Sequence, residues 1–182
     1  DKLFYTTPIK ALSNQKYRDF CARWGKDNVG LLTGDQSING DAPVVVMTTE
    51  VLRNMLYAES PTLHKLRYVV MDEVHYLSDA FRGAVWEEVI LSLPNTVQLI
   101  ALSATIGNTT EFANWISAVV GPTSVVTTDF RPVPLTANVL VNSTIYPLLN
   151  KSGNDVSRHL HNRVDRILHT PSHHERFPNR VQ

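Results

Sequence analysis

The stretch VVMDEVHYL, Val69–Leu77, runs from apolar residues directly into Asp72, Glu73 and His75. A short, continuous apolar run of this kind is typical of a strand that is buried on both faces of a sheet. Two adjacent carboxylates repel each other at neutral pH, and a nearby cation is the usual relief. Magnesium suits such oxygen ligands, because it takes only one or two protein carboxylates and keeps several waters. The stretch therefore predicts a buried strand that ends at a candidate magnesium site.

Similar apolar runs recur along the chain and are separated by segments of helical periodicity. The expected strands are LFY near residue 4, VGLL near 30, VVVM at 44–47, YVVM at 68–71, QLIAL near 100 and SVVT near 125. The expected helices carry apolar faces over residues 9–24, 85–93 and 112–119, with Thr7 as N-cap and Pro8 as first residue of the first helix, and Asn108 and Glu111 as a capping box. This alternation predicts an α/β fold, a parallel sheet with helices on both faces.

Polar residues follow four of the predicted strands at the point where each strand ends. These residues are Thr6, Thr7 and Pro8; Thr48, Thr49 and Glu50; Asp72, Glu73 and His75; and Ser103 and Thr105. The carboxyl ends of parallel strands share one edge of a sheet, where ligands bind, so we expect these side chains to converge. Helix capping explains Ser and Thr at such positions, but it does not explain paired carboxylates. One carboxylate can hold a metal's water shell while the other orients an attacking water, as phosphoryl transfer to water requires.

Composition sets broad limits on the function. The 182 residues are 43% hydrophobic, with 17 basic and 17 acidic side chains, so the chain lacks the positive charge typical of proteins that hold nucleic acid by counterion release. Backbone amides and hydroxyls can also hold phosphates, so nucleic-acid binding stays open. Cys21 is the single cysteine, which excludes an intramolecular disulfide. No apolar run approaches the roughly 20 residues that span a bilayer. We therefore expect a cytoplasmic protein without a membrane partner.

Several motifs resemble those of superfamily-two DExH-box helicases. DEVH at 72–75 resembles their motif II (Walker B), SAT at 103–105 their motif III, YTTPIKALSNQK at 5–16 motif Ia and TTEVLRNML at 48–56 motif Ib, with TGD at 33–35 between the last two. Longer stretches are similar to the Ski-two-like branch, which includes HelY-type proteins. These stretches are DEVHYLSDAFRGAVWEEVI, LSATIGNTTEFANWI and RPVPL. The match extends from about Leu3 to Leu135.

This resemblance implies a RecA-like fold and an ATP-dependent helicase that uses ATP and Mg²⁺. Asp72 would bind the magnesium of ATP through water, Glu73 would polarise the hydrolytic water, and His75 would couple hydrolysis to strand movement. The coupling partners of His75 would be Ser103 and Thr105. One nucleic-acid strand would lie along Thr7, Pro8, Lys10, Gly34, Asp35, Thr49, Glu50 and Arg53. The resemblance also implies single-stranded RNA rather than DNA as the partner, and a link to RNA-degradation machinery.

The chain has no GxxxxGK(S/T) loop, which supplies the main grip on ATP phosphates. Its single Gly-Lys pair is Gly25-Lys26, in a different context. We expect the sequence to begin just downstream of the P-loop strand and helix and to lack the second RecA-like domain. Residues 1–131 are then a partial RecA-like domain. Residues 132–182 are expected to form an exit linker, one helix capped by Asp155, and a mobile tail. The chain by itself is predicted not to hydrolyse ATP.

Two alternatives remain open at this stage. The chain could be a non-catalytic module for nucleic-acid binding or protein interaction that derives from a helicase and has lost ATPase function. DEVH could also belong to a metal-dependent hydrolase unrelated to ATP, which would need further carboxylate or histidine ligands nearby. The tail histidines do not have the HExxH spacing of a zinc protease, and no cysteine accompanies them.

Overall fold

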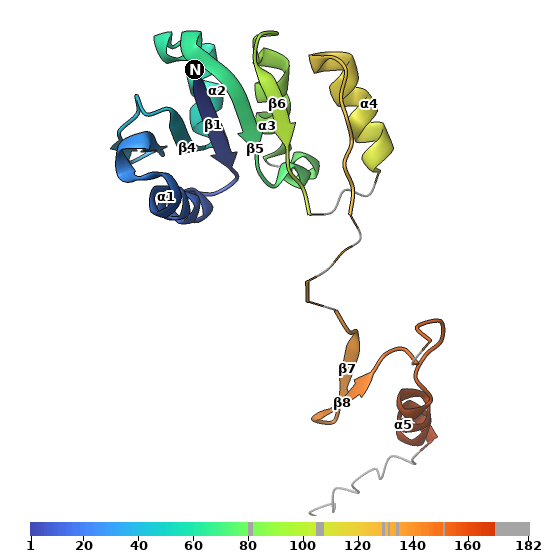
Figure 1. The fold of residues 1–182 in the computed structure, drawn as a ribbon. Coiled ribbons are helices and arrows are strands. Elements are labelled where there is room, and N and C mark those ends of the chain that lie inside the picture. The colour runs from blue at the N-terminus through green and yellow to red at the C-terminus, as the bar shows by residue number, and fades with distance from the viewer. Residues whose placement is uncertain are drawn as a thin grey trace, which may run out of the picture. The chain divides into compact units, whose positions relative to one another are not determined.

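The computed structural model describes residues 1–79, 82–104, 108–128, 130, 132–133, 135–150 and 152–169, and it divides into two compact units, 1–126 and 127–182 (Figure 1). In the first unit the strands are β1 (Lys2–Thr7), β2 (Val29–Leu32), β3 (Ser37–Ile38), β4 (Val44–Thr48), β5 (Leu66–Met71) and β6 (Gln98–Ala101). Its α-helices are α1 (Lys10–Trp24), α2 (Thr49–Tyr57), α3 (Gly83–Ser92) and α4 (Thr109–Val120). Short 3₁₀ helices are η1 (Lys26–Asn28), η2 (Pro61–Lys65) and η3 (Val74–Ser78).

The first unit is built on one sheet with the strand order β3-β2-β4-β1-β5-β6. Every neighbouring pair is parallel except β2 and β3, which pair antiparallel. The prediction of an α/β, RecA-like fold with a mostly parallel sheet is therefore confirmed. The strand expected at SVVT is wrong, since residues 122–128 form no strand. A strand needs a paired neighbour, and among the described residues none pairs with the outer edge of β6.

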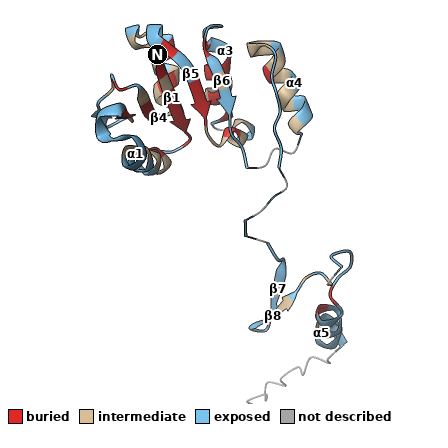
Figure 2. Cartoon of the chain, viewed as in Figure 1, coloured by how far each residue is buried: buried red, intermediate tan, exposed pale blue. Residues whose placement is uncertain are grey.

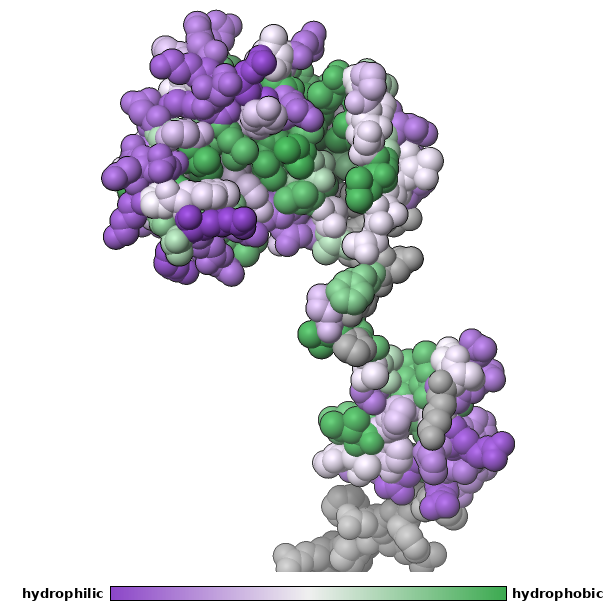
Figure 3. Space-filling view, in the orientation of Figure 1, coloured by the Kyte–Doolittle hydropathy of each residue, from purple (hydrophilic) through white to green (hydrophobic). Residues whose placement is uncertain are grey.

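Helices cover both faces of this sheet, as expected. On one face, α2, α3 and α4 pack over a core that contains Phe4, Val45, Met47, Val69, Met71, Leu52, Trp86 and Ile90, drawn as buried in Figure 2. On the other face, α1 covers a smaller core of Tyr5, Val29, Leu31, Val46 and Val70. Beyond the reach of α1 this second face is open, and Tyr68 and Ile100 are 43% and 38% exposed. Hydrophobic side chains gather over the middle of the first unit in Figure 3.

The turn from β1 into α1 differs from the expected cap. Thr7 still belongs to β1, and α1 begins at Lys10 with Ile9 at the N-cap, so Thr7 is not the cap and Pro8 is not the first helical residue. The Thr7 hydroxyl lies 2.7 Å from Ser13 Oγ and donates to the Ile9 carbonyl at 3.1 Å, which holds the turn instead. Asn108 is confirmed as the N-cap of α4, because the Glu111 amide donates to Asn108 Oδ1 at 3.2 Å. The Glu111 carboxylate accepts from the Asn108 side-chain amide at 2.6 Å and not from its backbone amide as in a full capping box.

The second unit contains a β-hairpin and a helix. Strands β7 (Asn138–Val141) and β8 (Thr144–Pro147) pair antiparallel, and α5 (Arg158–His169) follows. Leu160 of α5 is buried, whereas Val164, Ile167 and Leu168 are exposed. The helix begins after Asp155, which is therefore not its cap, and Val156 instead forms an isolated bridge with Leu149. The expected mobile tail, 170–182, lies outside the described residues. Within the described part of the chain, no helix combines the length and apolarity that crossing a membrane requires.

Candidate functional site

The carboxyl ends of the central strands are tied together by hydrogen bonds that continue past the sheet. The Asp72 amide donates to the Thr6 carbonyl at 2.9 Å, and the Val74 amide donates to the Leu102 carbonyl at 2.8 Å. These two bonds join the ends of β1, β5 and β6. The Thr49 hydroxyl donates to the Thr7 carbonyl at 3.2 Å and so attaches the start of α2 to the same edge. The convergence expected from the sequence is therefore present in the fold.

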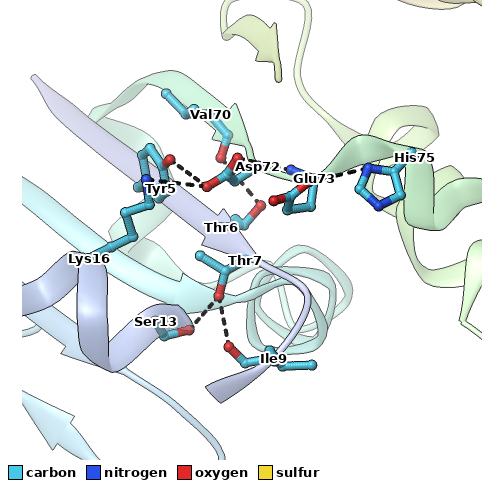
Figure 4. Close-up of polar contacts among 10 residues, drawn as sticks. All are labelled: Tyr5, Thr6, Thr7, Ile9, Ser13, Lys16, Val70, Asp72, Glu73 and His75. Carbon is cyan, nitrogen blue, oxygen red and sulfur yellow. Dashed lines mark hydrogen bonds and ion pairs between the residues drawn. The ribbon is translucent and has the colours of Figure 1, made fainter. Parts of the chain in front are cut away.

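Asp72 is held by three partners, as Figure 4 shows. Tyr5 donates its phenol O–H to Asp72 Oδ2 at 2.7 Å, and the Lys16 ammonium lies 3.6 Å from the same oxygen. The second oxygen, Oδ1, accepts the Glu73 amide at 3.0 Å. Burial, followed by the hydrogen bond to Asp72, raises the pKa of Tyr5 well above its ordinary value. The phenol therefore keeps its proton and acts as the donor.

Sequence reasoning did not identify Tyr5 and Lys16 as partners of Asp72. Both lie in the motif Ia stretch, but no local pattern connects that stretch with DEVH. The signal that could have found Tyr5 is the sheet register, which pairs Tyr5 with Val70, two residues before Asp72. Lys16 lies on α1, on the face of the sheet toward which Tyr5 points. Its ammonium is also 5.4 Å from the centre of the Tyr5 ring.

Glu73 adopts a left-handed backbone conformation, with φ 55° and ψ 42°. The chain does not continue in extended form past β5, because η3 begins at Val74. The turn nevertheless brings His75 Nδ1 to 3.2 Å from Glu73 Oε2. His75 Nδ1 has no hydrogen-bond partner among the described residues, so the contact becomes a favourable ion pair only when His75 is protonated.

The backbone strain at Glu73 can be measured. A non-glycine residue in this region costs about 1 kcal/mol, so we expect Glu73→Gly to raise the free energy of unfolding by about 0.5–1 kcal/mol. Urea denaturation measures the change. Glu59, at φ 46° and outside the site, is the matched control, and Glu59→Gly should stabilise the chain similarly. If Glu73→Gly destabilised the chain while Glu59→Gly did not, the Glu73 side chain would contribute more to the free energy of unfolding than the backbone strain costs.

The proposed coupling partners are only partly visible. Ser103 follows β6 and is exposed, and His75 Nδ1 has no hydrogen-bond partner in the part of the chain that the structure describes. Thr105 lies outside the described residues, so its coupling role stays a prediction. Within the described ranges no three His, Cys, Asp or Glu side chains are grouped closely enough to hold a metal ion by themselves. Asp72 and Glu73 fit the lesser requirement of a magnesium ion that keeps its waters and binds nucleotide phosphates.

The predicted nucleic-acid contacts fall into an exposed and a buried set. Lys10, at the start of α1, pairs with Asp35 in the loop after β2, and this joins motif Ia to the TGD element. The hydrogen bond from Lys10, followed by that from Thr33, lowers the pKa of Asp35. Gly34 is exposed beside this pair in the sequence, whereas Pro8 is buried. The hydroxyls of Thr7 and Thr49 are instead buried and bonded within the chain.

The remaining two predicted contacts lie on α2. Glu50 is half-buried in the first turn of that helix. Arg53 lies one turn further on, and its guanidinium is 3.6 Å from Glu88 of α3 and 3.1 Å from the side-chain oxygen of its neighbour Asn54. Arg53 therefore connects α2 to α3 and retains only part of its surface for a ligand.

Comparison with known proteins gives the family. Residues 1–112 match the family model for the DEAD/DEAH box helicase. The chain belongs to the DEAD/DEAH box helicase family. It is 62% identical over 149 residues to the probable helicase HelY of Mycobacterium tuberculosis H37Rv, a match that covers 82% of this chain and 16% of that protein. It is 49% identical over 152 residues to the antiviral helicase SKI2 of Saccharomyces cerevisiae, covering 83% of this chain and 12% of that protein.

A solved structure shares the fold of this helicase segment. The helicase Lhr of Mycobacterium smegmatis, solved with single-stranded DNA and AMP-PNP, aligns with a TM-score of 0.52 at 29% identity and covers 64% of this chain and 18% of that one. The chain thus spans less than a fifth of the length of each of these relatives. The close similarity to HelY and SKI2 confirms the Ski-two-like resemblance read from the motifs.

Proposed function

We propose that this chain is the part of an ATP-dependent RNA helicase motor that carries the magnesium-binding and water-activating carboxylates. The observation that carries this proposal is the constrained Asp72 carboxylate at the shared edge of β1, β5 and β6. Asp72 would hold the magnesium of ATP through water, and Glu73 would polarise the hydrolytic water. The bound ion would supply charge neutralisation at the phosphates. His75, beside Glu73, would transmit the state of the site to Ser103 and Thr105.

The proposed nucleic-acid path uses the outer part of the same edge. Lys10, Gly34 and Asp35 present an exposed surface, and Glu50 and Arg53 extend it along α2, with the buried Thr7, Pro8 and Thr49 shaping the backbone beneath. Such contacts address the sugar-phosphate backbone, which suits a chain without net charge and a motor without sequence preference. Single-stranded RNA rather than DNA, RNA-degradation machinery as partner and a cytoplasmic location belong to the same proposal and extend the Ski-two-like resemblance.

We further propose that the chain by itself does not hydrolyse ATP. Its sequence contains no phosphate-binding loop. In the described residues, Lys16 is the one lysine that pairs with Asp72. Among the described residues, no strand pairs with the outer edge of β6. Tyr68 and Ile100, on the face that α1 covers in part, are exposed. Without a phosphate-binding loop, ATP is not held beside Asp72 and Glu73.

A chimera separates this proposal from the rival reading, a helicase-derived module that has lost ATPase function. The matching segment of M. tuberculosis HelY is replaced by this chain, and ATP hydrolysis is measured with and without single-stranded RNA. We expect the chimera to hydrolyse ATP and Glu73→Gln to reduce the rate by at least ~100-fold, the scale of a lost general base. Glu59→Gln, a change of the same kind outside the site, should leave the rate unchanged.

Two outcomes would contradict the proposal. An inactive chimera that is folded and binds RNA would favour the non-catalytic module. Magnesium-dependent hydrolysis by the 182-residue chain alone, lost on Glu73→Gln, would show that the chain needs no external phosphate grip.

A further inference from the structure

The Lys16 ammonium lies 3.6 Å from Asp72 Oδ2. Asp72 has a side chain only 16% exposed, and Lys16 is 35% exposed, so the pair lies between core and solvent. A carboxylate with so little access to water gains more from a nearby positive charge than one on the open surface. Lys16 supplies that charge when no metal ion is present.

Tyr5 constrains both members of this pair. Its O–H bonds Asp72 Oδ2 at 2.7 Å, and its ring lies under the Lys16 ammonium at 5.4 Å. The ring is fixed in turn, because Tyr5 is only 7% exposed and packs edge-on against Phe20 with ring centres 5.1 Å apart. Oδ2 is thus shared between a phenol and an ammonium, while Oδ1 accepts the Glu73 amide (Figure 4).

We propose that Lys16 is the resident counter-ion of Asp72, that Tyr5 fixes the orientation of the carboxylate, and that a divalent ion recruited by Asp72 competes with the Lys16 ammonium. This inference rests on the proposed role of Asp72 in metal binding and adds two positioning residues to it. The site then alternates between a lysine-paired state and a metal-bound state. In the lysine-paired state, Lys16 and Tyr5 hold the carboxylate in place.

The competition predicts opposite effects for the two residues. Removing Lys16 deletes an ammonium group that pairs with Asp72 Oδ2 and repels the metal ion, so the affinity of the site for divalent ions should rise. Removing the Tyr5 hydroxyl leaves the carboxylate free to rotate and to pair more closely with Lys16, so divalent affinity should fall. A residue that merely supports the fold would not raise affinity when it is replaced.

The test titrates Mn²⁺, a paramagnetic substitute for Mg²⁺, into the 182-residue chain and follows free Mn²⁺ by electron paramagnetic resonance. We expect Lys16→Met to tighten the Asp72-dependent binding roughly three- to tenfold, the effect of one unit charge a few Å away at a partly exposed site. Tyr5→Phe should weaken it about two- to fivefold, the effect of losing one hydrogen bond to a carboxylate. Lys16→Arg, which keeps the charge, should stay near the wild-type affinity. Lys26→Met, the same charge change in η1, should leave the affinity unchanged.

The outcomes distinguish this inference from the function on which it rests. Binding that is lost in Asp72→Asn but is not tightened by Lys16→Met would overturn the counter-ion role and leave the metal role of Asp72 intact. Absence of any binding that depends on Asp72, in the wild type and in Lys16→Met, would overturn the competition, while the role of Asp72 toward the magnesium of ATP is tested separately by ATP hydrolysis in the HelY chimera. Thermal unfolding of each variant confirms that the compared chains are folded.

Discussion

Trp86→Ala is expected to lower the free energy of unfolding by about 3–5 kcal/mol, the usual cost of deleting a buried large aromatic side chain. Trp86 is 0% exposed and belongs to the core between the sheet and α2, α3 and α4. Its ring also stacks on Tyr76 of η3, with centres 5.9 Å apart. Because η3 follows Glu73 directly, the substitution should loosen the turn that positions this carboxylate. Urea denaturation measures the loss of stability.

Trp86→Phe is the matched control. The indole Nε1 is buried without a hydrogen-bond partner among the described residues, so losing this N–H removes no bond. Phe retains most of the apolar volume, and we expect less than half of the cost of Trp86→Ala. Equal losses for the two variants would mean that the indole nitrogen has a stabilising partner, contrary to the packing described above.

Gly83→Ala is expected to cost about 2–3 kcal/mol or more, because the added methyl group has no room. A Cβ at Gly83 would lie 2.2 Å from the Leu77 carbonyl oxygen and 3.0 Å from its carbon, and both are backbone atoms that cannot rotate away. Either the start of α3 or the end of η3 must therefore move. Since η3 follows Glu73 and contains His75, the displacement should reach the candidate site. The measurements are urea denaturation and the amide chemical shifts of residues 74–78.

Two further glycines separate a general steric effect from a local one. Gly30→Ala should destabilise comparably, because its Cβ would lie 2.2 Å from the Asn39 carbonyl oxygen, but it should leave the amide shifts of 74–78 largely unchanged. Gly34→Ala meets no atom within 4 Å and should cost little. If Gly83→Ala were as mild as Gly34→Ala, the close approach of α3 to η3 would not exist in solution.

The fold was predictable to the extent that its signals are local. Continuous apolar runs such as those of β1, β4 and β5 identify buried parallel strands, and 3.6-residue periodicity identifies α3 and α4, because each pattern depends on near neighbours in the chain. SVVT carried the same local signal yet is not a strand. Val126 is 94% exposed there, since strand formation needs a hydrogen-bonding neighbour that the local sequence does not encode.

For the candidate site, the sequence by itself determined which residue types stand at the strand ends and which family they resemble. The order of strands along the sheet then brought Asp72, Thr6 and Leu102 together, as expected for parallel strands. Only the tertiary structure decided the surroundings of the carboxylates. Tyr5 is 67 residues from Asp72 in the chain, and the two meet because β1 and β5 lie side by side in one register. The left-handed turn at Glu73 likewise follows from packing around η3, since no local preference of glutamate favours it.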